Sequence, residues 1–307
     1  MKRKIAVLAV LFIVFLAGAF LLYNVQIRYR RVKSQHNALE YKKELWTGLK
    51  KHLAREIKGF KGNVSIVIKD FSTDWEIDFN KEELLPSASL IKIPIMLSCF
   101  YAENDGKICL TDKAILRHCD KVAGSKALAG KPAGSVFTIE ELLKPMITLS
   151  DNASANVLID FLGFDTLNAY FRKMGLRNTN LARKMMDFKE RSEGEENYTT
   201  AEDMAYILDK LYRGNFLNKD VSGHCLALLG QQKINDRIPR KLPRNETFIA
   251  HKTGLERHVC HDVGIVFTQK GDFMICVLVK HDEKLARNAK RLIANVALAT
   301  YRYYQNL

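Results

Sequence analysis

The segment Pro86–Met96, PSASLIKIPIM, contains the pair of residues on which the reading of this sequence depends. Ser89 and Lys92 are three residues apart, so a helix that starts near Ser87 would place both side chains on one face. A lysine in that position can reach the serine hydroxyl, and burial or a second nearby cation would lower its pKa enough for it to act as a base. Ser89 is therefore a candidate nucleophile and Lys92 its candidate base.

Two further polar motifs follow along the chain. Ser150-Asp151-Asn152 lies where one predicted helix ends and the next begins, and the ordinary explanation is that Ser150 or Asp151 caps the second helix. Lys252-Thr253-Gly254 lies at the end of a predicted strand, where a strand-end turn is the ordinary explanation. Each motif is weak alone, and their occurrence together in this order is what points to a site.

The apolar pattern around these motifs predicts an α+β fold. Five short segments have the composition and alternation of strands: 64–70, 75–80, 248–253, 263–268 and 273–279. Helical patterns cover residues 37–60, most of 87–240, and 283–304. We expect a five-stranded antiparallel sheet with the terminal helices packed on it, beside an all-helical lobe from about 87 to 240, with a cleft between them.

In this order the three motifs resemble the serine penicillin-recognising family, most closely the class A β-lactamases and their related serine hydrolases. The resemblance covers about residues 37–307, which we expect to form one catalytic domain of the β-lactamase/transpeptidase type. It implies that Ser89 is acylated, that Lys92 is the base for acylation and that Ser150 passes a proton to the leaving nitrogen. The oxyanion would be bound by the backbone N–H groups of Ser89 and Leu255.

The same resemblance assigns the substrate-binding groups. Asn152 would bind the amide side chain of the substrate. Lys252 and Thr253 would bind its carboxylate beside Gly254, and Lys252 would help to keep Lys92 neutral. The family needs no cofactor and no metal ion, so neither is expected. The partner that this implies is a small β-lactam or a peptidoglycan-like substrate.

The loop before Tyr198-Thr199-Thr200 departs from the family pattern. Efficient class A enzymes carry a glutamate there, which activates the water that hydrolyses the acyl-enzyme. Counting back without gaps places Met185 at that position, with Asp187 as the nearest carboxylate. Asp187 is a candidate base, because an apolar setting would raise its pKa towards a useful value. The alternative is that Asp187 is a structural loop residue, and Glu190 is a weaker candidate.

Histidine and cysteine residues near the third motif raise two other hypotheses. His258, Cys260 and His261 follow the strand end, but their spacing matches no strong zinc pattern, so no metal site is expected. Six cysteines in an exported chain would permit disulfides, and a bridge between Cys119 and Cys260 is one hypothesis. Cys276, inside an apolar strand, is expected to be a core residue.

The positive charge is concentrated at the N-terminus. The formal net charge is +14, and residues 1–60 hold 13 of the 48 Lys and Arg but 3 of the 34 Asp and Glu. The uncharged run 5–23 follows three basic residues and would rise about 28 Å as a helix, close to a bilayer core. We expect residues 1–24 to be a signal anchor, or else a cleaved signal peptide, followed by a basic juxtamembrane linker over 25–36. The mildly basic remainder argues against nucleic acid as a partner.

Three functions are consistent with these observations. The first is β-lactam hydrolysis through an acyl-enzyme. The second, favoured by the missing glutamate, is a D-alanyl-D-alanine peptidase or another cell-wall amidase or esterase that deacylates β-lactams slowly. The third is a non-catalytic protein that binds wall fragments. In each case we expect a monomer in the cell envelope, anchored in the cytoplasmic membrane with its catalytic domain outside (periplasmic), or secreted if the leader is cleaved.

Overall fold

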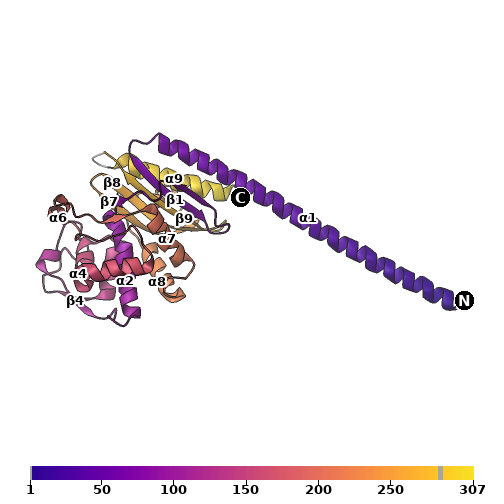
Figure 1. Ribbon diagram of the computed structural model, residues 1–307, viewed down its shortest axis with the longest axis horizontal. Coiled ribbons are helices and arrows are strands. Elements are labelled where there is room, and N and C mark those ends of the chain that lie inside the picture. The colour runs from indigo at the N-terminus through magenta and orange to yellow at the C-terminus, as the bar shows by residue number, and fades with distance from the viewer. Residues whose placement is uncertain (1, 283–285) are drawn as a thin grey trace. The chain divides into compact units, whose positions relative to one another are not determined.

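The computed structural model describes residues 2–282 and 286–307, without the side chains of 2–14, 17, 19 and 35. The chain divides into two units, one of residues up to His52 with Leu307 and the other of residues 53–306. Helix α1 (Lys2–Lys58) continues unbroken through the predicted membrane segment, the basic linker and the first amphipathic helix (Figure 1).

Among the residues described, no helix combines the length and the apolar character needed to cross a membrane. Most of the predicted span, residues 5–23, has its side chains outside the described set. The membrane anchor therefore stays a prediction.

The second unit is built on a five-stranded sheet (Figure 1). Its strands are β1 (Asn63–Asp70), β2 (Glu76–Phe79), β7 (Thr247–Glu256), β8 (Val259–Thr268) and β9 (Phe273–Lys280). The order is β2-β1-β9-β8-β7, and every neighbouring pair is antiparallel. Strands from both ends of the sequence share this sheet because β1 pairs with β9, with Val67 opposite Cys276. The predicted sheet is confirmed.

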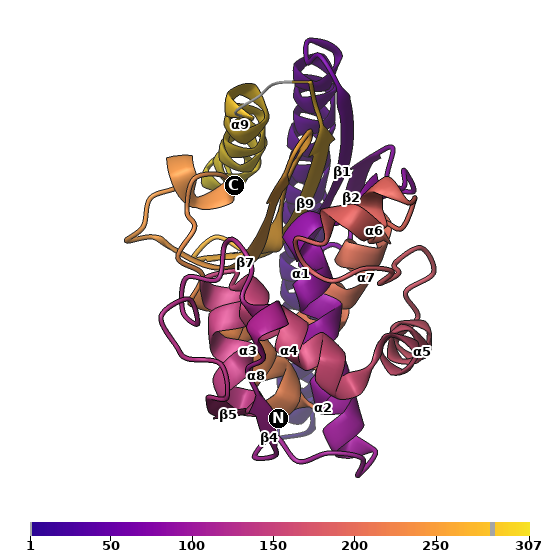
Figure 2. The ribbon, with the colours of Figure 1, turned by 90° about the vertical axis from the view of Figure 1, so that its left-hand side faces the viewer.

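Helices cover the sheet and form a separate lobe. Helix α9 (Arg287–Gln305) contacts β8 and β9, and α7 (Ala201–Tyr212) contacts β1, β8 and β9. The remaining helices are α2 (Lys92–Asn104), α3 (Ile139–Thr148), α4 (Asn152–Leu162), α5 (Phe164–Met174), α6 (Phe188–Ser192) and α8 (Lys219–Gly230). Figure 2 shows α2, α3, α4 and α8 gathered in the lobe, with α9 apart from them. The predicted helical lobe is confirmed.

Helix α2 is the centre of the lobe. Its residues from Lys92 to Phe100 are all buried, as expected for a helix that is apolar on nearly every side. Helix α3 begins at the predicted capping box, in which the Thr138 hydroxyl accepts from the N–H of Glu141 and the Glu141 carboxylate accepts from the N–H of Thr138. The helices that carry the site are thus held by local sequence signals and by burial.

Short elements join the parts of this unit. Two small antiparallel ladders pair β3 (Leu85–Pro86) with β6 (Tyr198–Thr199), and β4 (Lys113–Ile115) with β5 (Val136–Thr138). Three 3-10 helices are η1 (Ala88–Ile91), η2 (His118–Asp120) and η3 (Ile238–Lys241). The pairing of β3 with β6 fixes the segment immediately before Ser89 against the end of the loop that contains Met185.

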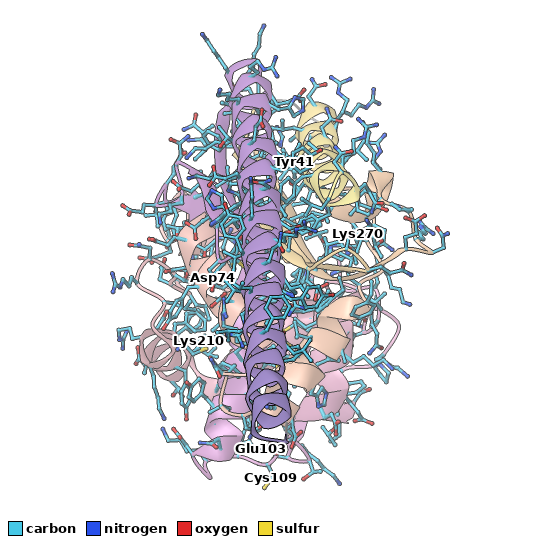
Figure 3. All side chains as sticks on the ribbon, turned by 90° about the vertical axis from the view of Figure 1, so that its right-hand side faces the viewer. Tyr41, Asp74, Glu103, Cys109, Lys210 and Lys270 are labelled. Atoms are coloured by element: carbon cyan, nitrogen blue, oxygen red, sulfur yellow. The ribbon has the colours of Figure 1, made fainter. Side chains whose placement is uncertain are left out.

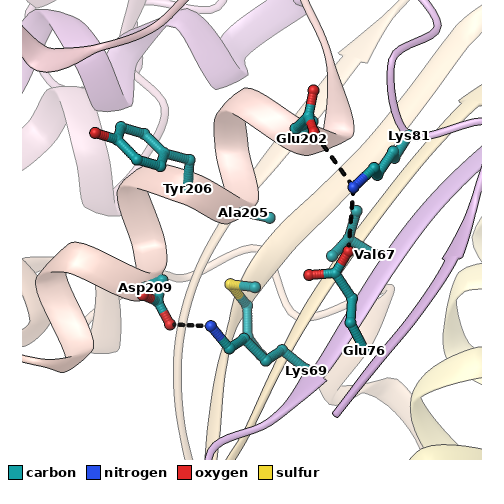
Figure 4. A pocket seen from close by; sticks show the side chains of 9 residues that line it. Val67, Lys69, Glu76, Lys81, Glu202, Ala205, Tyr206 and Asp209 are labelled. Atoms are coloured by element: carbon teal, nitrogen blue, oxygen red, sulfur yellow. Dashed lines mark hydrogen bonds and ion pairs between the residues drawn. The ribbon is translucent and has the colours of Figure 1, made fainter. Parts of the chain in front are cut away.

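Charged side chains connect α7 to the edge of the sheet (Figure 4). Lys69 Nζ lies 2.9 Å from the Asp209 carboxylate. Lys81 Nζ lies 3.4 Å from Glu76 and 3.3 Å from Glu202. These pairs surround a surface cavity and hold α7 on β1 and β2.

All six cysteines are free thiols. Cys109 is exposed (Figure 3), and so is Cys119, whereas Cys260 is buried. The hypothesis of a bridge between Cys119 and Cys260 is therefore wrong, because the two residues lie in different environments and are not bonded. Cys276 is fully buried in β9, which confirms its prediction as a core residue.

Candidate active site

The nucleophile turn is formed by η1 and the start of α2. Ser89 lies in η1 and is half-buried, and Lys92 is the first residue of α2 and is completely buried. The backbone N–H of Lys92 donates to the carbonyl of Ser89, so the two residues are one tight turn apart. Among the described residues no hydrogen bond joins the Ser89 hydroxyl to Lys92, whose amine is bound to the second motif instead.

The Lys92 amine contacts three oxygen atoms of that motif. Its Nζ lies 2.6 Å from the Ser150 carbonyl, 3.3 Å from Ser150 Oγ and 2.6 Å from Asn152 Oδ1. Burial lowers the pKa of Lys92 to about 7, against an opposing effect of the Asp151 carboxylate. A substantial fraction of the Lys92 side chain is therefore a neutral amine at neutral pH, as a base requires.

Lys252, on β7, approaches the same hydroxyl from the other side. Its Nζ lies 2.9 Å from Ser150 Oγ and 2.9 Å from the Thr253 carbonyl. Burial, followed by the charge of Lys92, holds the pKa of Lys252 well below its usual range. Ser150 has a left-handed backbone with φ of 58°, and its hydroxyl lies between two lysine nitrogens. In this arrangement the Ser150 hydroxyl can exchange a proton with either amine.

The neighbouring residues of the second motif have separate tasks. Asp151 caps α4 by accepting from the N–H of Ser154 at 2.9 Å. Asn152 donates from Nδ2 to the Ala123 carbonyl at 2.7 Å while its Oδ1 binds Lys92. The helix cap proposed as the ordinary explanation is thus present, and it is supplied by Asp151, which leaves Ser150 to contact the lysines.

Ser89 opens onto a cavity of about 50 Å³ between the lobe and β7. Its lining residues are Ala88, Ser89, Asn152, Arg183, Met185, Met186, Asn197, Leu255 and Glu256. Strand β7 comes very close at Gly254, where an added Cβ would lie 3.2 Å from the Ser87 carbonyl. Glycine at this position therefore allows β7, with Thr253 and Leu255, to approach the nucleophile turn.

The two methionines, and not the predicted carboxylates, lie on this cavity. Met185 is buried, and its backbone N–H donates to Asn156 Oδ1 at 2.8 Å. Asp187 is the N-cap of α6 and accepts from the N–H of Glu190 at 3.2 Å. Neither Asp187 nor Glu190 is among the described residues that line the cavity. The cap contact is what the structural alternative expects, and the role of Asp187 as a base stays a prediction.

A buried ion-pair network, which sequence reasoning missed, joins this loop to β7. The Arg183 guanidinium lies 2.7 Å from Glu196 and 3.0 Å from Glu256. Arg191 lies 3.0 Å from each of the same two carboxylates. The pairs that reach Glu256 are more than sixty residues apart, so no local spacing in the sequence could indicate them. The network fixes one wall of the cavity.

We expect Glu196→Gln to reduce the free energy of unfolding by about 3 kcal/mol, because it leaves the buried guanidinium of Arg183 without its nearest carboxylate. Urea denaturation measures this loss. Glu193→Gln is the matched control, since Glu193 is exposed and lies 3.8 Å from Lys189 in a surface pair that is worth about 0.5 kcal/mol or less. Equal effects of the two substitutions would contradict a stabilising network.

The side chains considered as metal ligands have three separate sets of partners. His258 Nδ1 lies 3.1 Å from the His281 carbonyl, and Cys260 Sγ accepts from Arg237 Nε at 3.2 Å. His261 Nε2 lies 2.8 Å from the Pro86 carbonyl. Within the described part of the chain, no group of three or more His, Cys, Asp or Glu side chains is arranged to hold a metal ion.

An antiparallel sheet beside a helical lobe, with a serine on a turn and a second serine between two buried lysines, defines a class of α+β serine hydrolases. The chain belongs to the beta-lactamase enzyme family, whose model matches residues 48–304. This membership confirms the predicted resemblance and the predicted serine hydrolase activity on cyclic amides.

Known proteins match most of the chain. A beta-lactamase of Rhodobacter capsulatus is 25% identical over 228 residues, which cover 73% of this chain and 76% of that protein. The crystal structure of a beta-lactamase from Sphaerobacter thermophilus has a TM-score of 0.76 and 28% identity, covering 85% of this chain and 98% of the other. The structure of PBP-A has a TM-score of 0.78 and 25% sequence identity, and the match covers 85% of this chain and 97% of PBP-A.

Proposed function

We propose that this enzyme opens β-lactam rings by acylation of Ser89 and that hydrolysis of the acyl-enzyme is the slow step. The neutral amine of Lys92 takes the Ser89 proton as the hydroxyl attacks the carbonyl carbon. The oxyanion that forms accepts hydrogen bonds from the N–H groups of Ser89 and Leu255. The cluster of Lys92, Ser150 and Lys252 is the observation that carries this proposal. The amine reaches Ser89 by a side-chain rotation on substrate binding, since catalytic hydrogen bonds often tighten only then.

Collapse of the tetrahedral intermediate breaks the C–N bond and leaves an ester on Ser89. The leaving nitrogen takes a proton from the Ser150 hydroxyl, which is replaced by the proton that Lys92 received. The short distances from Ser150 Oγ to both lysine nitrogens support this route.

The substrate groups follow from the same geometry. Lys252 and Thr253 bind the carboxylate of the substrate beside Gly254, where β7 has room for close approach. Asn152, which lines the cavity, binds the amide side chain. A bound carboxylate would also stabilise the protonated form of Lys252.

Slow deacylation is supported by the residues around the cavity. Met185 and Met186 line the cavity on the side of the loop. A general base that activates the water for hydrolysis of the acyl-enzyme would be needed on this side. Glu256 lines the cavity, but its carboxylate is paired with Arg183 and Arg191. The same observation favours a second candidate, a D-alanyl-D-alanine peptidase or related wall enzyme, for which a long-lived β-lactam ester is expected. Asp187 could act as base only if the loop moved.

We also propose that the enzyme is a monomer, tethered to the cytoplasmic membrane with its catalytic domain outside. The uncharged run 5–23 between basic segments supports the tether. Alkaline extraction of membranes and protease treatment of spheroplasts test the location, and recovery in the cytoplasmic fraction would contradict it.

The experiment that tests the main proposal is intact-protein mass spectrometry of the enzyme with a penicillin, followed over time. We expect an adduct with the full mass of the penicillin to form and to persist for hours, and the Ser89→Ala variant to form none. Rapid loss of the adduct with accumulation of product would show that another group acts as base. An adduct on both proteins, or on neither, would contradict acylation of Ser89.

The rate of acylation is expected to rise with pH through about 7. Only the neutral amine of Lys92 is a base, and its fraction falls tenfold for each pH unit below the pKa. We therefore expect acylation at pH 5 to be about 100-fold slower than on the plateau above pH 8. Stopped-flow measurement of the acylation phase between pH 5 and 9 checks this, and a flat profile would contradict Lys92 as base.

A further inference from the structure

A buried histidine connects the sheet to the segment before the nucleophile. His261, on β8, is completely buried. The backbone N–H of Val279, on β9, donates to His261 Nδ1 at 3.1 Å. Because Nδ1 accepts a hydrogen bond, the ring proton is on Nε2, which donates to the Pro86 carbonyl at 2.8 Å. One imidazole thus satisfies two backbone groups from distant parts of the chain.

This tautomer is maintained across the working pH range. Burial lowers the pKa of His261 to about 4, and the charges of Arg237 and His281 act in the same direction. The hydrogen bond to Pro86 opposes them. The ring is therefore neutral when Lys92 becomes a base, and the donor at Nε2 is always present.

The carbonyl that His261 holds lies three residues before Ser89. On the other side of this segment, the N–H of Ser87 donates to the Asn197 carbonyl at 2.7 Å. The Ser87 carbonyl faces Gly254, and an added Cβ at Gly254 would lie 3.1 Å from the His261 ring. The imidazole, Gly254 and the segment before Ser89 are therefore packed directly against one another.

Two backbone N–H groups must lie at a fixed separation to bind an oxyanion. One belongs to Ser89, two residues after Ser87, and the other to Leu255, one residue after Gly254. We propose that His261 is a positioning residue that sets the separation of these two donors by holding Pro86 against β8. This inference rests on the proposed acylation of Ser89, and it assigns the residue a task in the transition state rather than in substrate binding.

Two substitutions separate the two hydrogen bonds of the ring. In His261→Gln the side-chain amide places an N–H donor where Nε2 lies, so the hydrogen bond to the Pro86 carbonyl is kept. In His261→Asn the shorter amide places an acceptor near Nδ1 for the Val279 N–H but does not reach Pro86. With a chromogenic cephalosporin in stopped flow, we expect His261→Asn to slow the acylation rate constant by about 10- to 100-fold. His261→Gln should recover most of this rate, and the constant for reversible binding should change little in both variants.

The melting temperatures of the two variants provide the structural control, since each variant loses one buried hydrogen bond. The proposal would be overturned if acylation is slowed equally in the Gln and Asn variants. It would also be overturned if the slowing only follows the decrease in melting temperature. If His261→Asn does not fold, the ¹⁵N shifts of the His261 ring in the wild-type enzyme provide the second test. A proton on Nδ1, or a ring that titrates between pH 5 and 8, would overturn it. Absence of any adduct on wild-type Ser89 would instead refute the proposed function.

Discussion

Replacing Lys92 by Met should slow acylation of Ser89 by about 10⁴-fold, the upper range for the loss of a general base. Lys92 is completely buried, and Met fills a similar volume without an amine. The substitution leaves Ser150 and Lys252 in place, so substrate binding should be retained while the proton of Ser89 loses its proposed acceptor. Single-turnover kinetics with a chromogenic cephalosporin measure the effect, and the adduct seen by mass spectrometry should form correspondingly slowly.

Lys144→Met is the matched control, since Lys144 is an exposed residue of α3. We expect this variant to be acylated at the wild-type rate. Lys252 offers another route for the proton, because its Nζ is 2.9 Å from Ser150 Oγ. If Lys92→Met acylates at nearly the wild-type rate, Lys92 is not the base. Loss of that residual rate in the double variant with Lys252→Met would then assign the proton transfer to Lys252 and Ser150.

The fold was predictable wherever local pattern and burial agree. The strands 64–70 and 273–279 are short and apolar, and they become neighbouring central strands of the sheet. The pairs of β3 with β6 and of β4 with β5 were not predicted, because two or three residues carry no periodicity. Strand β8 also begins earlier than the predicted 263–268, since Cys260 and the polar residues His261 and Asp262 are buried in it. From the sequence alone, such polar residues are assigned to a loop.

The candidate site was predictable to the extent that its motifs are local. Ser89 with Lys92, and Ser150 with Asn152, are pairs that a short spacing indicates. The contact of Lys252 with Ser150 spans 102 residues and was not predicted, although the family resemblance placed both residues in one site. Arg183 and Glu256 could not be paired from the sequence, because their contact depends on how the loop folds back onto β7. Long-range contacts between charged groups carry no periodic signal.

Introducing a carboxylate at Met185 should allow the long-lived acyl-enzyme to be hydrolysed, so that the enzyme turns over. Met185 lines the same cavity as Ser89, and its backbone is held on both sides by Asn156, through the N–H at 2.8 Å and the carbonyl at 3.2 Å. A Glu side chain of similar length would therefore enter the volume that Met185 now fills. We expect Met185→Glu to speed deacylation by about 10²- to 10⁴-fold, the usual contribution of a positioned general base.

The environment favours a useful pKa for that carboxylate. Burial would raise the pKa of the new glutamate, while the guanidinium of Arg183, also on the cavity, would lower it. Arg183 is already bound by Glu196 and Glu256, so its charge is largely compensated. Burial should therefore be the larger effect and raise the pKa of the new carboxylate above the ordinary glutamate value, which makes it a better acceptor for the proton of water.

Met185→Gln separates the chemistry of the base from the change in shape and polarity. Gln has nearly the same size as Glu and can hold water, but it cannot take a proton. We expect Met185→Gln to keep an adduct that persists for hours, and both variants to be acylated at rates close to wild type because the lysine pair is unchanged. Equal adduct lifetimes in the Glu and Gln variants would show that the missing carboxylate does not limit turnover. The slow hydrolysis of the acyl-enzyme would then need another cause, such as exclusion of water from the cavity by the loop that Arg183 fixes to β7.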